Sequence, residues 1–155
     1  MTTDLTHLLG SEALGDAAAR LVQVVDPLRV VPGWATVELD RAEAEVGAVI
    51  GPSSDVTVTE AAPDLLLGAR CRILRSAGAE IALLEPSTEG PLAAALARFG
   101  EGSLVAYLLV NAAAPERARE AAFSLSNERA GPFGRERLVR SGPRWGPFLV
   151  LAGLD

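Results

Sequence analysis

The fold is decided by residues 69–86, ARCRILRSAGAEIALLEP, which contain two alternating segments around a tight turn. In the first segment, ARCRILR (69–75), arginine alternates with cysteine and isoleucine, and this period of two is typical of a β-strand. Residues 76–78, Ser-Ala-Gly, are a hairpin turn signal, and AEIALLE (79–85) is the expected return strand. The stretch therefore predicts a β-hairpin.

The residues before the hairpin predict a strand, a helix and a further strand. WATVELD (34–40) alternates apolar and polar residues, RAEAEVGAVI (41–50) carries its apolar residues at helical spacing, and DVTVTE (55–60) alternates again. Together with the hairpin, these segments give the order strand, helix, strand, strand, strand. Residues 34–85 are therefore predicted to form a βαβββ unit.

Residues 1–33 are expected to form an N-terminal extension outside this unit. SEALGDAAARLVQVV (11–25) has the apolar spacing of an amphipathic helix. LRVV (28–31) is a short strand candidate, and Pro32-Gly33 has the composition of a turn.

The second half of the chain predicts a similar but shorter unit. Residues 86–102 form a linker, whose short helix starts at Pro91, a residue favoured in the first turn of a helix. The second unit, residues 103–155, follows with a strand (103–110), a helix (115–130) and two strands (136–140 and 147–152). It is one strand short, so we expect the N-terminal extension or a second chain to cover the unpaired sheet edge.

Composition limits the function classes. The chain has 155 residues, 49% of them hydrophobic, which is enough for one compact domain with its own core. Its 14 basic residues are all arginine, which argues against P-loop and Schiff-base chemistry, and the net charge of −6 argues against a nucleic-acid or anionic-membrane surface. The single Cys and single His exclude an internal disulfide and a histidine-rich metal site. No targeting segment or membrane span is visible, so a cytoplasmic location is expected.

The sequence resembles the vicinal oxygen chelate superfamily, which includes glyoxalase I, methylmalonyl-CoA epimerase and bleomycin-resistance proteins. Residues 69–110 look like the epimerase-type pattern of strand, turn, EIELLEP-like strand, linker and GEG, and LDRAEAEV (39–46) resembles the entry into the first helix. The resemblance implies an α+β fold in which paired βαβββ modules form a cupped mixed sheet. It also implies a homodimer and a small-molecule substrate.

Members of this superfamily bind a divalent metal through four side chains, and the resemblance places apolar residues at those positions here. The carboxylate of the EIELLEP-like strand falls at Ala82, and the histidine of the second module falls at Val105 or Leu104. The first ligand has no counterpart near residues 34–36, and the last has nothing to align with. We therefore expect no metal and no cofactor.

Strand alternation gives a set of candidate site residues. If the apolar positions Ala35, Val37, Leu39, Val56, Val58, Cys71 and Ile73 pack under the helices, the opposite side chains line the cup. Glu38 is then the predicted base, with a pKa raised by burial, Arg72 holds a developing oxyanion, and Tyr107, on the same side as the lost histidine, donates to a carbonyl. The predicted substrate-binding residues are Trp34, Thr36, Thr57, Thr59, Arg70 and Trp145.

Structural roles are open for every one of these residues. Alternating Thr and Glu are common on the solvated face of a sheet, and Arg70 and Arg72 could pair with acids on neighbouring strands. Tyr107 lies in an apolar strand, where a core position is an even alternative. Cys71 is interpreted as a small buried hydrophobe, and His7 as non-catalytic.

The favoured functional hypothesis is a metal-independent lyase or isomerase of the dehydratase/cyclase type. Its substrate would be a polyketide or similar enolisable intermediate of bacterial secondary metabolism. The first alternative is a protein that binds an antibiotic or another small molecule without turnover. The second is a metal-dependent epimerase or glyoxalase, which requires ligands that the sequence does not show.

Overall fold

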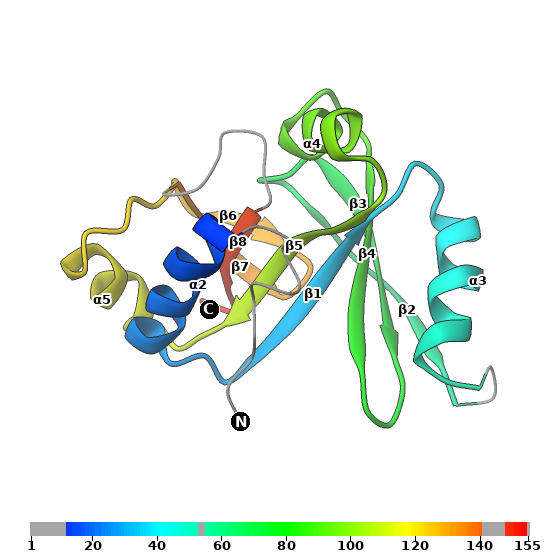
Figure 1. Ribbon diagram of the computed structural model, residues 1–155, viewed down its shortest axis with the longest axis horizontal. Helices are drawn as coiled ribbons and strands as arrows, with labels where there is room; N and C mark the ends of the chain where they lie inside the picture. Colours follow the sequence, from blue (N-terminus) through cyan, green and yellow to red (C-terminus); the bar gives the residue numbers. More distant parts are fainter. Residues whose placement is uncertain (1–11, 53–54, 141–147, 155) are drawn as a thin grey trace.

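The computed structural model of the protein describes residues 12–52, 55–140 and 148–154 (Figure 1). They form one curved eight-stranded sheet with the strand order β2-β3-β4-β1-β5-β8-β7-β6. The first half contains β1 (Arg29–Ala35), α3 (Leu39–Ile50), β2 (Thr57–Asp64), β3 (Ala69–Arg75) and β4 (Glu80–Pro86). The second half contains β5 (Gly102–Leu109), α5 (Ala114–Glu120), β6 (Arg129–Gly131), β7 (Gly134–Val139) and β8 (Phe148–Ala152). Helix α2 (Glu12–Val25) precedes β1, and α4 (Pro91–Phe99) connects the halves.

Both halves follow the order strand, helix, strand, strand, strand, which confirms the predicted α+β fold of paired βαβββ modules. The central pair is β1 and β5, which run antiparallel. On either side of this pair, β1 runs parallel to β4 and β5 runs parallel to β8. The two modules therefore meet edge to edge through their first strands.

The prediction that the second module lacks a strand was wrong. Residues 115–130 were expected to be one helix, but α5 ends at Glu120, and residues 129–131 form the short strand β6. Ala122 has a φ of 72°, a left-handed conformation that does not continue a helix. Because β6 completes the module, the missing-strand argument for a dimer no longer holds, and the homodimer stays a prediction.

The predicted turn at Pro32-Gly33 was also wrong, because both residues lie inside β1. Residues 28–31 are thus the start of the first module's own strand and not a separate strand of an extension. Pairing of β1 with β4 begins only at Gly33, so Pro32 lies where β1 is paired with β5 alone. A proline is tolerated in a strand where its missing N–H has no partner.

Helices α2, α3 and α5 cover the outer, convex face of the sheet. Helix α3 packs on the first half through Leu39, Ala42 and Val46, against Leu74 and Leu83. The outer face of the second half is covered by α2 together with the short α5, in a cluster built around Ala18, Leu21, Val25, Ala106, Leu108, Ala118, Leu149 and Leu151. The N-terminal helix therefore covers a face of the sheet, and not an unpaired edge as predicted.

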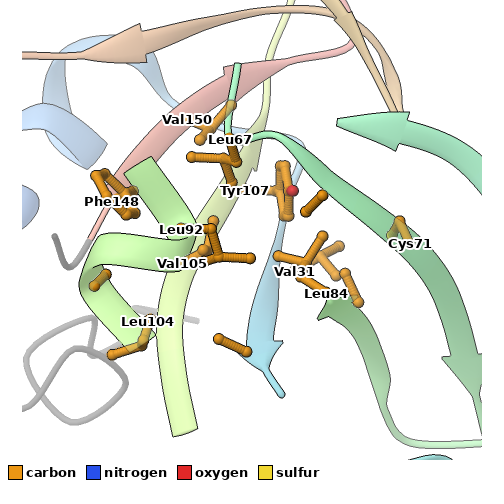
Figure 2. Packing of buried hydrophobic residues seen from close by; sticks show 14 of the residues in the cluster. Val31, Leu67, Cys71, Leu84, Leu92, Leu104, Val105, Tyr107, Phe148 and Val150 are labelled. Atoms are coloured by element: carbon orange, nitrogen blue, oxygen red, sulfur yellow. The ribbon is translucent and has the colours of Figure 1, made fainter. Parts of the chain in front are cut away.

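The inner, concave face encloses the largest core cluster of the molecule (Figure 2). Its side chains come from β1, β3, β4, β5 and β8, and α4 adds Leu92, Ala95 and Leu96 at one end. The outermost strands of the sheet approach each other where the N–H of Leu65 donates to the carbonyl of Ala130 over 3.1 Å. We call this contact the seam.

Among the helices of the described residues, none has the length and apolar character needed to cross a bilayer.

Candidate functional site

The structure reverses much of the predicted assignment of inner and outer faces. Cys71, Ile73 and Ala35 were expected to pack under the helices, but all three belong to the inner-face core. Leu39 packs under α3 as expected, whereas Val37 is 64% exposed. Alternation gives the two faces of a strand but does not show which face is concave, and here both faces carry apolar residues.

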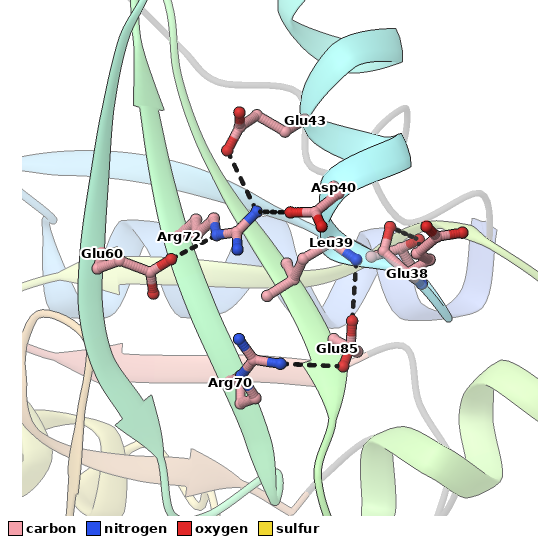
Figure 3. A network of polar contacts seen from close by, with 9 residues as sticks. Glu38, Leu39, Asp40, Glu43, Glu60, Arg70, Arg72 and Glu85 are labelled. Atoms are coloured by element: carbon pink, nitrogen blue, oxygen red, sulfur yellow. Dashed lines mark hydrogen bonds and ion pairs between the residues drawn. The ribbon is translucent and has the colours of Figure 1, made fainter.

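Arg72 lies on the outer face, in an ion-pair network with α3 and β2 (Figure 3). Its Nη1 is 2.7 Å from an Oδ1 of Asp40 and 3.3 Å from an Oε1 of Glu43, and its Nε donates to Glu60. Hydrogen bonds from Arg72, first to Asp40 and then to Glu60, raise its pKa above the ordinary value. The structure therefore gives Arg72 an ion-pairing role between α3 and the sheet, remote from the inner face.

Arg70 makes a similar outer-face contact. Its Nη1 is 3.4 Å from an Oε1 of Glu85, whose other oxygen accepts from the backbone N–H of Leu39 at 2.9 Å (Figure 3). The side chain of Arg70 is 55% exposed. Both arginines thus have the charge-pairing role that the sequence left open.

Glu38, the predicted base, lies just before α3 with a side chain that is 62% exposed. Its carboxylate lies 3.8 Å from the guanidinium of Arg41. The burial on which the prediction rested is absent, and Glu38 lies away from the inner face that holds Tyr107.

Thr36 is fully buried but engaged in a surface network around Glu101. The Oε2 atom of Glu101 accepts three hydrogen bonds: from the Thr36 hydroxyl at 2.6 Å, from the Val37 N–H at 2.8 Å and from Arg41 Nη2 at 2.7 Å. These contacts, led by the hydrogen bond from Arg41, lower the pKa of Glu101 to about 2. The network holds the end of β1 against the start of β5.

The other predicted binding residues are not gathered at one place. Trp34 packs with the outer-face cluster under α3. Thr57 and Thr59 pair with Arg75 and Ile73, which puts them on the inner-face side of β2, where both are exposed. Trp145 lies outside the described residues.

Tyr107 is the one predicted catalytic residue that the structure places on the inner face (Figure 2). It is fully buried, and its hydroxyl donates to an Oδ2 of Asp64 over 2.7 Å. The other oxygen of Asp64 accepts from the N–H of Leu67 at 2.9 Å. Burial, and then the charge of Asp64, raise the pKa of Tyr107 well above its ordinary value. The phenol is therefore a proton donor throughout the physiological range.

Space for the Tyr107 ring comes from a glycine on the neighbouring strand. Val31 pairs with Tyr107 and Gly33 with Val105 in the β1–β5 ladder. A Cβ on Gly33 would lie 2.8 Å from the Cβ of Val105 and 3.4 Å from the Tyr107 ring. Only a residue without a side chain lets the strands and the ring approach this closely.

Glu136 on β7 is the second buried acid beside Asp64. It has no exposed surface, and neither of its Oε atoms meets a hydrogen-bond donor among the described residues. Burial is the main cause that raises its pKa far above that of an ordinary glutamate, followed by hydrogen bonding to Asp64 and by the negative charge of Asp64. The raised pKa favours the neutral acid over an unpaired buried carboxylate. A glycine again makes room, because a Cβ on Gly131 would overlap the Glu136 carboxyl group.

Cys71 completes this group, which we call the acid cluster: Asp64, Cys71, Tyr107 and Glu136. Cys71 is 1% exposed, and burial, with a smaller contribution from the charge of Asp64, raises the pKa of its thiol. It is therefore a neutral thiol and a poor nucleophile. Phe133, on the turn between β6 and β7, packs edge-on against Tyr107 with 5.1 Å between ring centroids.

Sequence reasoning missed Asp64 and Glu136. Asp64 lies beyond residues 55–60, where the predicted strand ended, although β2 continues to it. Glu136 fell in a predicted strand, two residues before the apolar Leu138 and therefore on the same face of that strand. An acid among the apolar positions of a strand could have marked Glu136 as a candidate. Such an acid is either neutral or paired when buried.

The inner face does not fit a divalent metal. Ala82 and Val105, where the resemblance places two ligands, lie in the apolar core. Within residues 12–52, 55–140 and 148–154, no three His, Cys, Asp or Glu side chains are close enough together to hold an ion. A stable site takes at least three such donors, so the residues described here do not supply one.

Comparison with known proteins finds likeness in structure alone. No family model and no curated protein sequence matches the chain. Methylmalonyl-CoA epimerase from Mycobacterium tuberculosis superimposes with a TM-score of 0.68 at 22% identity, over 83% of this chain and 88% of that one. A hypothetical protein from Bacillus halodurans C-125 superimposes with a TM-score of 0.62 at 18% identity, over 80% and 92%. Together with the paired βαβββ topology, these matches show that the chain has the vicinal oxygen chelate fold.

Proposed function

We propose that the protein is an acid–base lyase or isomerase that acts on a small enolisable carbonyl compound through the acid cluster. The observation that carries this proposal is the 2.7 Å hydrogen bond from the fully buried Tyr107 hydroxyl to Asp64, together with the buried carboxyl group of Glu136, whose pKa is raised by burial and by Asp64. A carboxyl pair of this kind offers one group to accept a proton and another to donate one. The general chemistry agrees with the sequence-based hypothesis, while Asp64 and Glu136 replace Glu38 and Arg72.

Asp64 is the base in this proposal. Its two oxygens accept hydrogen bonds from the Tyr107 hydroxyl and the Leu67 N–H, which are the contacts that a carboxylate makes. Its carboxylate takes the proton from a carbon next to a carbonyl, and the Tyr107 hydroxyl, released from Asp64, donates a hydrogen bond to the resulting enolate oxygen.

Glu136 is the acid. In an isomerisation, it returns a proton to the carbon, and a proton then passes from Asp64 to Glu136 to restore the pair. In a dehydration, the C–O bond breaks and Glu136 gives its proton to the leaving hydroxyl, which departs as water. Polyketide-type intermediates suit either course, because carbons between two carbonyl groups are acidic.

Access to the acid cluster requires movement of a side chain. Phe133 covers Tyr107 from the β6–β7 turn, and the seam between Leu65 and Ala130 lies beside that turn. A substrate that enters here displaces the Phe133 ring. Water is then excluded again when the ring returns, which strengthens the electrostatic interactions at the reacting carbon.

The test is solvent deuterium exchange, which works with simple carbonyl compounds in place of the natural substrate. A panel of 2-oxo acids, 3-oxo acids and 3-oxo thioesters is incubated with the protein in deuterated buffer, and loss of the α-proton signal is followed by proton NMR. We expect catalysed exchange in at least one class, and a fall of about 100-fold or more in Asp64→Asn and about tenfold or more in Tyr107→Phe.

Glu116→Gln is the matched control, because Glu116 is an exposed acid on α5 with a side chain that is 69% exposed. Circular dichroism checks that each variant is folded. Saturable binding of panel compounds without exchange would overturn the enzyme proposal and favour the alternative, a small-molecule-binding protein. Exchange that persists in both folded Asp64→Asn and Tyr107→Phe would remove the acid cluster from the reaction.

A further inference from the structure

A second polar group lies on the inner face, away from the acid cluster. Arg29 at the start of β1 and Arg75 at the end of β3 share one carboxylate, that of Glu80 at the start of β4. With Ser76 and Ala79 of the β3–β4 turn, they line a surface pocket of about 440 Å³. We call it the arginine pocket.

All three charged residues of the arginine pocket point to the inner-face side. Side chains two residues apart on a strand lie on the same face. Each member is two residues from a member of the inner-face core: Arg29 from Val31, Arg75 from Ile73, and Glu80 from Ala82. The pocket therefore opens at the rim of the concave surface that contains the acid cluster.

The contacts leave the ends of both arginines available to a ligand. Glu80 Oε1 accepts from Arg29 Nε at 3.0 Å, and its Oε2 accepts from Arg75 Nε at 2.7 Å. Within the described part of the chain, no hydrogen bond uses the terminal nitrogens of either guanidinium. The arginine side chains are 53% and 46% exposed, whereas Glu80 is 17% exposed. Glu80 thus fixes the position of two guanidinium groups whose forked ends face solvent.

The charge of this arrangement favours an anion. Two guanidinium groups and one carboxylate leave a net charge of +1 in a protein whose total is −6. Guanidinium forks match carboxylates and phosphates, which they bind through parallel hydrogen bonds. An oxyanion is therefore the ligand class that the pocket suits.

Strand register links the arginine pocket to the acid cluster. Arg29 pairs with Leu109, Leu109 with Ala152, and Ala152 with Glu136, so the arginine and the acid lie in one row across four strands. Three spacings between strands amount to about 14 Å along the sheet. Curvature of the sheet and the length of both side chains shorten this gap, so one small molecule can span it.

We infer that the arginine pocket binds an oxyanion, a carboxylate or phosphate, of the same substrate whose enolisable carbon reaches the acid cluster. This inference rests on the proposed function for the identity of the reacting end. The binding of the oxyanion itself is independent of that function. The substrate class is thus an acidic carbonyl compound with the anion and the reacting carbon at opposite ends.

Binding is tested without turnover, by NMR titration of the labelled protein with sodium malonate and, separately, with inorganic phosphate at low ionic strength. Malonamide, which has nearly the same shape as malonate but no charge, is the control ligand. We expect saturable shifts in the resonances of Ser76 and Ala79 with at least one oxyanion, and none with malonamide. The oxyanion that binds more tightly shows whether the pocket prefers a carboxylate or a phosphate.

The variants Arg29→Ala and Arg75→Ala should each weaken oxyanion binding by about tenfold or more. Arg29→Lys and Arg75→Lys, which keep the charge but lack the fork, should bind with intermediate strength. Arg119→Ala is the matched control, since Arg119 on α5 is 45% exposed and paired with Glu116 at 3.6 Å. Equal binding by wild type and both folded alanine variants, or equal shifts with malonamide, would refute the inference.

Tyr107→Phe separates this inference from the proposed function. The arginine pocket predicts that this variant binds the oxyanion as wild type does, even though deuterium exchange is slowed. If the arginine variants lose binding while the acid-cluster variants keep full exchange, the pocket stands and the proposed reaction does not. If instead the acid-cluster variants lose exchange while the arginine variants bind the oxyanion as wild type does, the inference about the arginine pocket is refuted and the proposed reaction stands.

Discussion

Replacing Glu136 by glutamine tests the central electrostatic claim, that this buried acid keeps its proton in the folded protein. Glu136 has no exposed surface, and burial and Asp64 raise its pKa far above the value of about 4.3 in an unfolded chain. Between these two values, unfolding releases a proton, because the unfolded state binds fewer protons than the folded state. The free energy of unfolding therefore falls as pH rises, by about 1.4 kcal/mol per pH unit.

Between pH 5.5 and 7.5 this slope amounts to about 3 kcal/mol, a large part of the 5–15 kcal/mol typical of a domain. Glutamine has the shape of the protonated acid and keeps a donor for Asp64, but it does not titrate. Glu136→Gln should therefore lose the slope, and its stability should equal or exceed that of wild type at pH 7.5.

The assay is urea unfolding, followed by circular dichroism, at pH steps of half a unit. A His7→Gln background removes the single imidazole from the window, and the thiol and phenol titrate above it in an unfolded chain. Glu116→Gln, an exposed acid, is the control and should leave the slope unchanged. A flat wild-type profile, or an equal slope in Glu136→Gln, would show that Glu136 is ionised in the folded protein and would refute the reasoning.

Two further predictions concern other parts of the sheet. The contacts of Glu101 lower its pKa to about 2, so they stabilise the fold above the pKa of an unfolded glutamate, and this stabilisation is lost as pH falls from about 4.5 to 2. In thermal melting across pH 2–5, the melting temperature should fall less with acidification in Glu101→Gln than in wild type. An equal fall in both proteins would contradict a stabilising ion pair between Glu101 and Arg41. Gly33→Ala should cost about 1–3 kcal/mol in urea unfolding, because its new Cβ meets Val105 at 2.8 Å, whereas Gly78→Ala, with open space around it, serves as the neutral control.

The hairpin of residues 69–86 shows what alternation can predict. The strand Ala69–Arg75 has the predicted bounds, and its two faces separate arginine from cysteine and isoleucine as expected. The concave side was nevertheless assigned to the wrong face. In this sheet one side is covered by helices and the other is filled by a core, so the polarity of a residue does not show its side. A polar residue stands at position 72 because Arg72 forms ion pairs with Asp40 and Glu43 of α3, and not because this face lines the concave side of the sheet.

The missed elements have a different physical cause. Strand β6 has three residues and no periodicity that could distinguish it from the end of the predicted helix. Pro32 and Gly33 have turn composition, but pairing with β5 and the close approach of Val105 hold them in a strand. Asp64 and Glu136 are distant in sequence and become one site only through folding. Tyr107 was identified because the family resemblance marked its strand.

The position of α2 has a consequence for synthesis on the ribosome. This helix is made long before β8, yet Leu21 and Val25 belong to the same core cluster as Leu149 and Leu151 of that strand. During translation, the apolar side of the helix lacks part of its cluster until β8 has been made. Contacts this distant in sequence slow folding and expose nascent chains to association. The first module, whose helix α3 and strands β1 to β4 are close together in sequence, can form its contacts earlier and so limit the apolar surface that the nascent chain exposes.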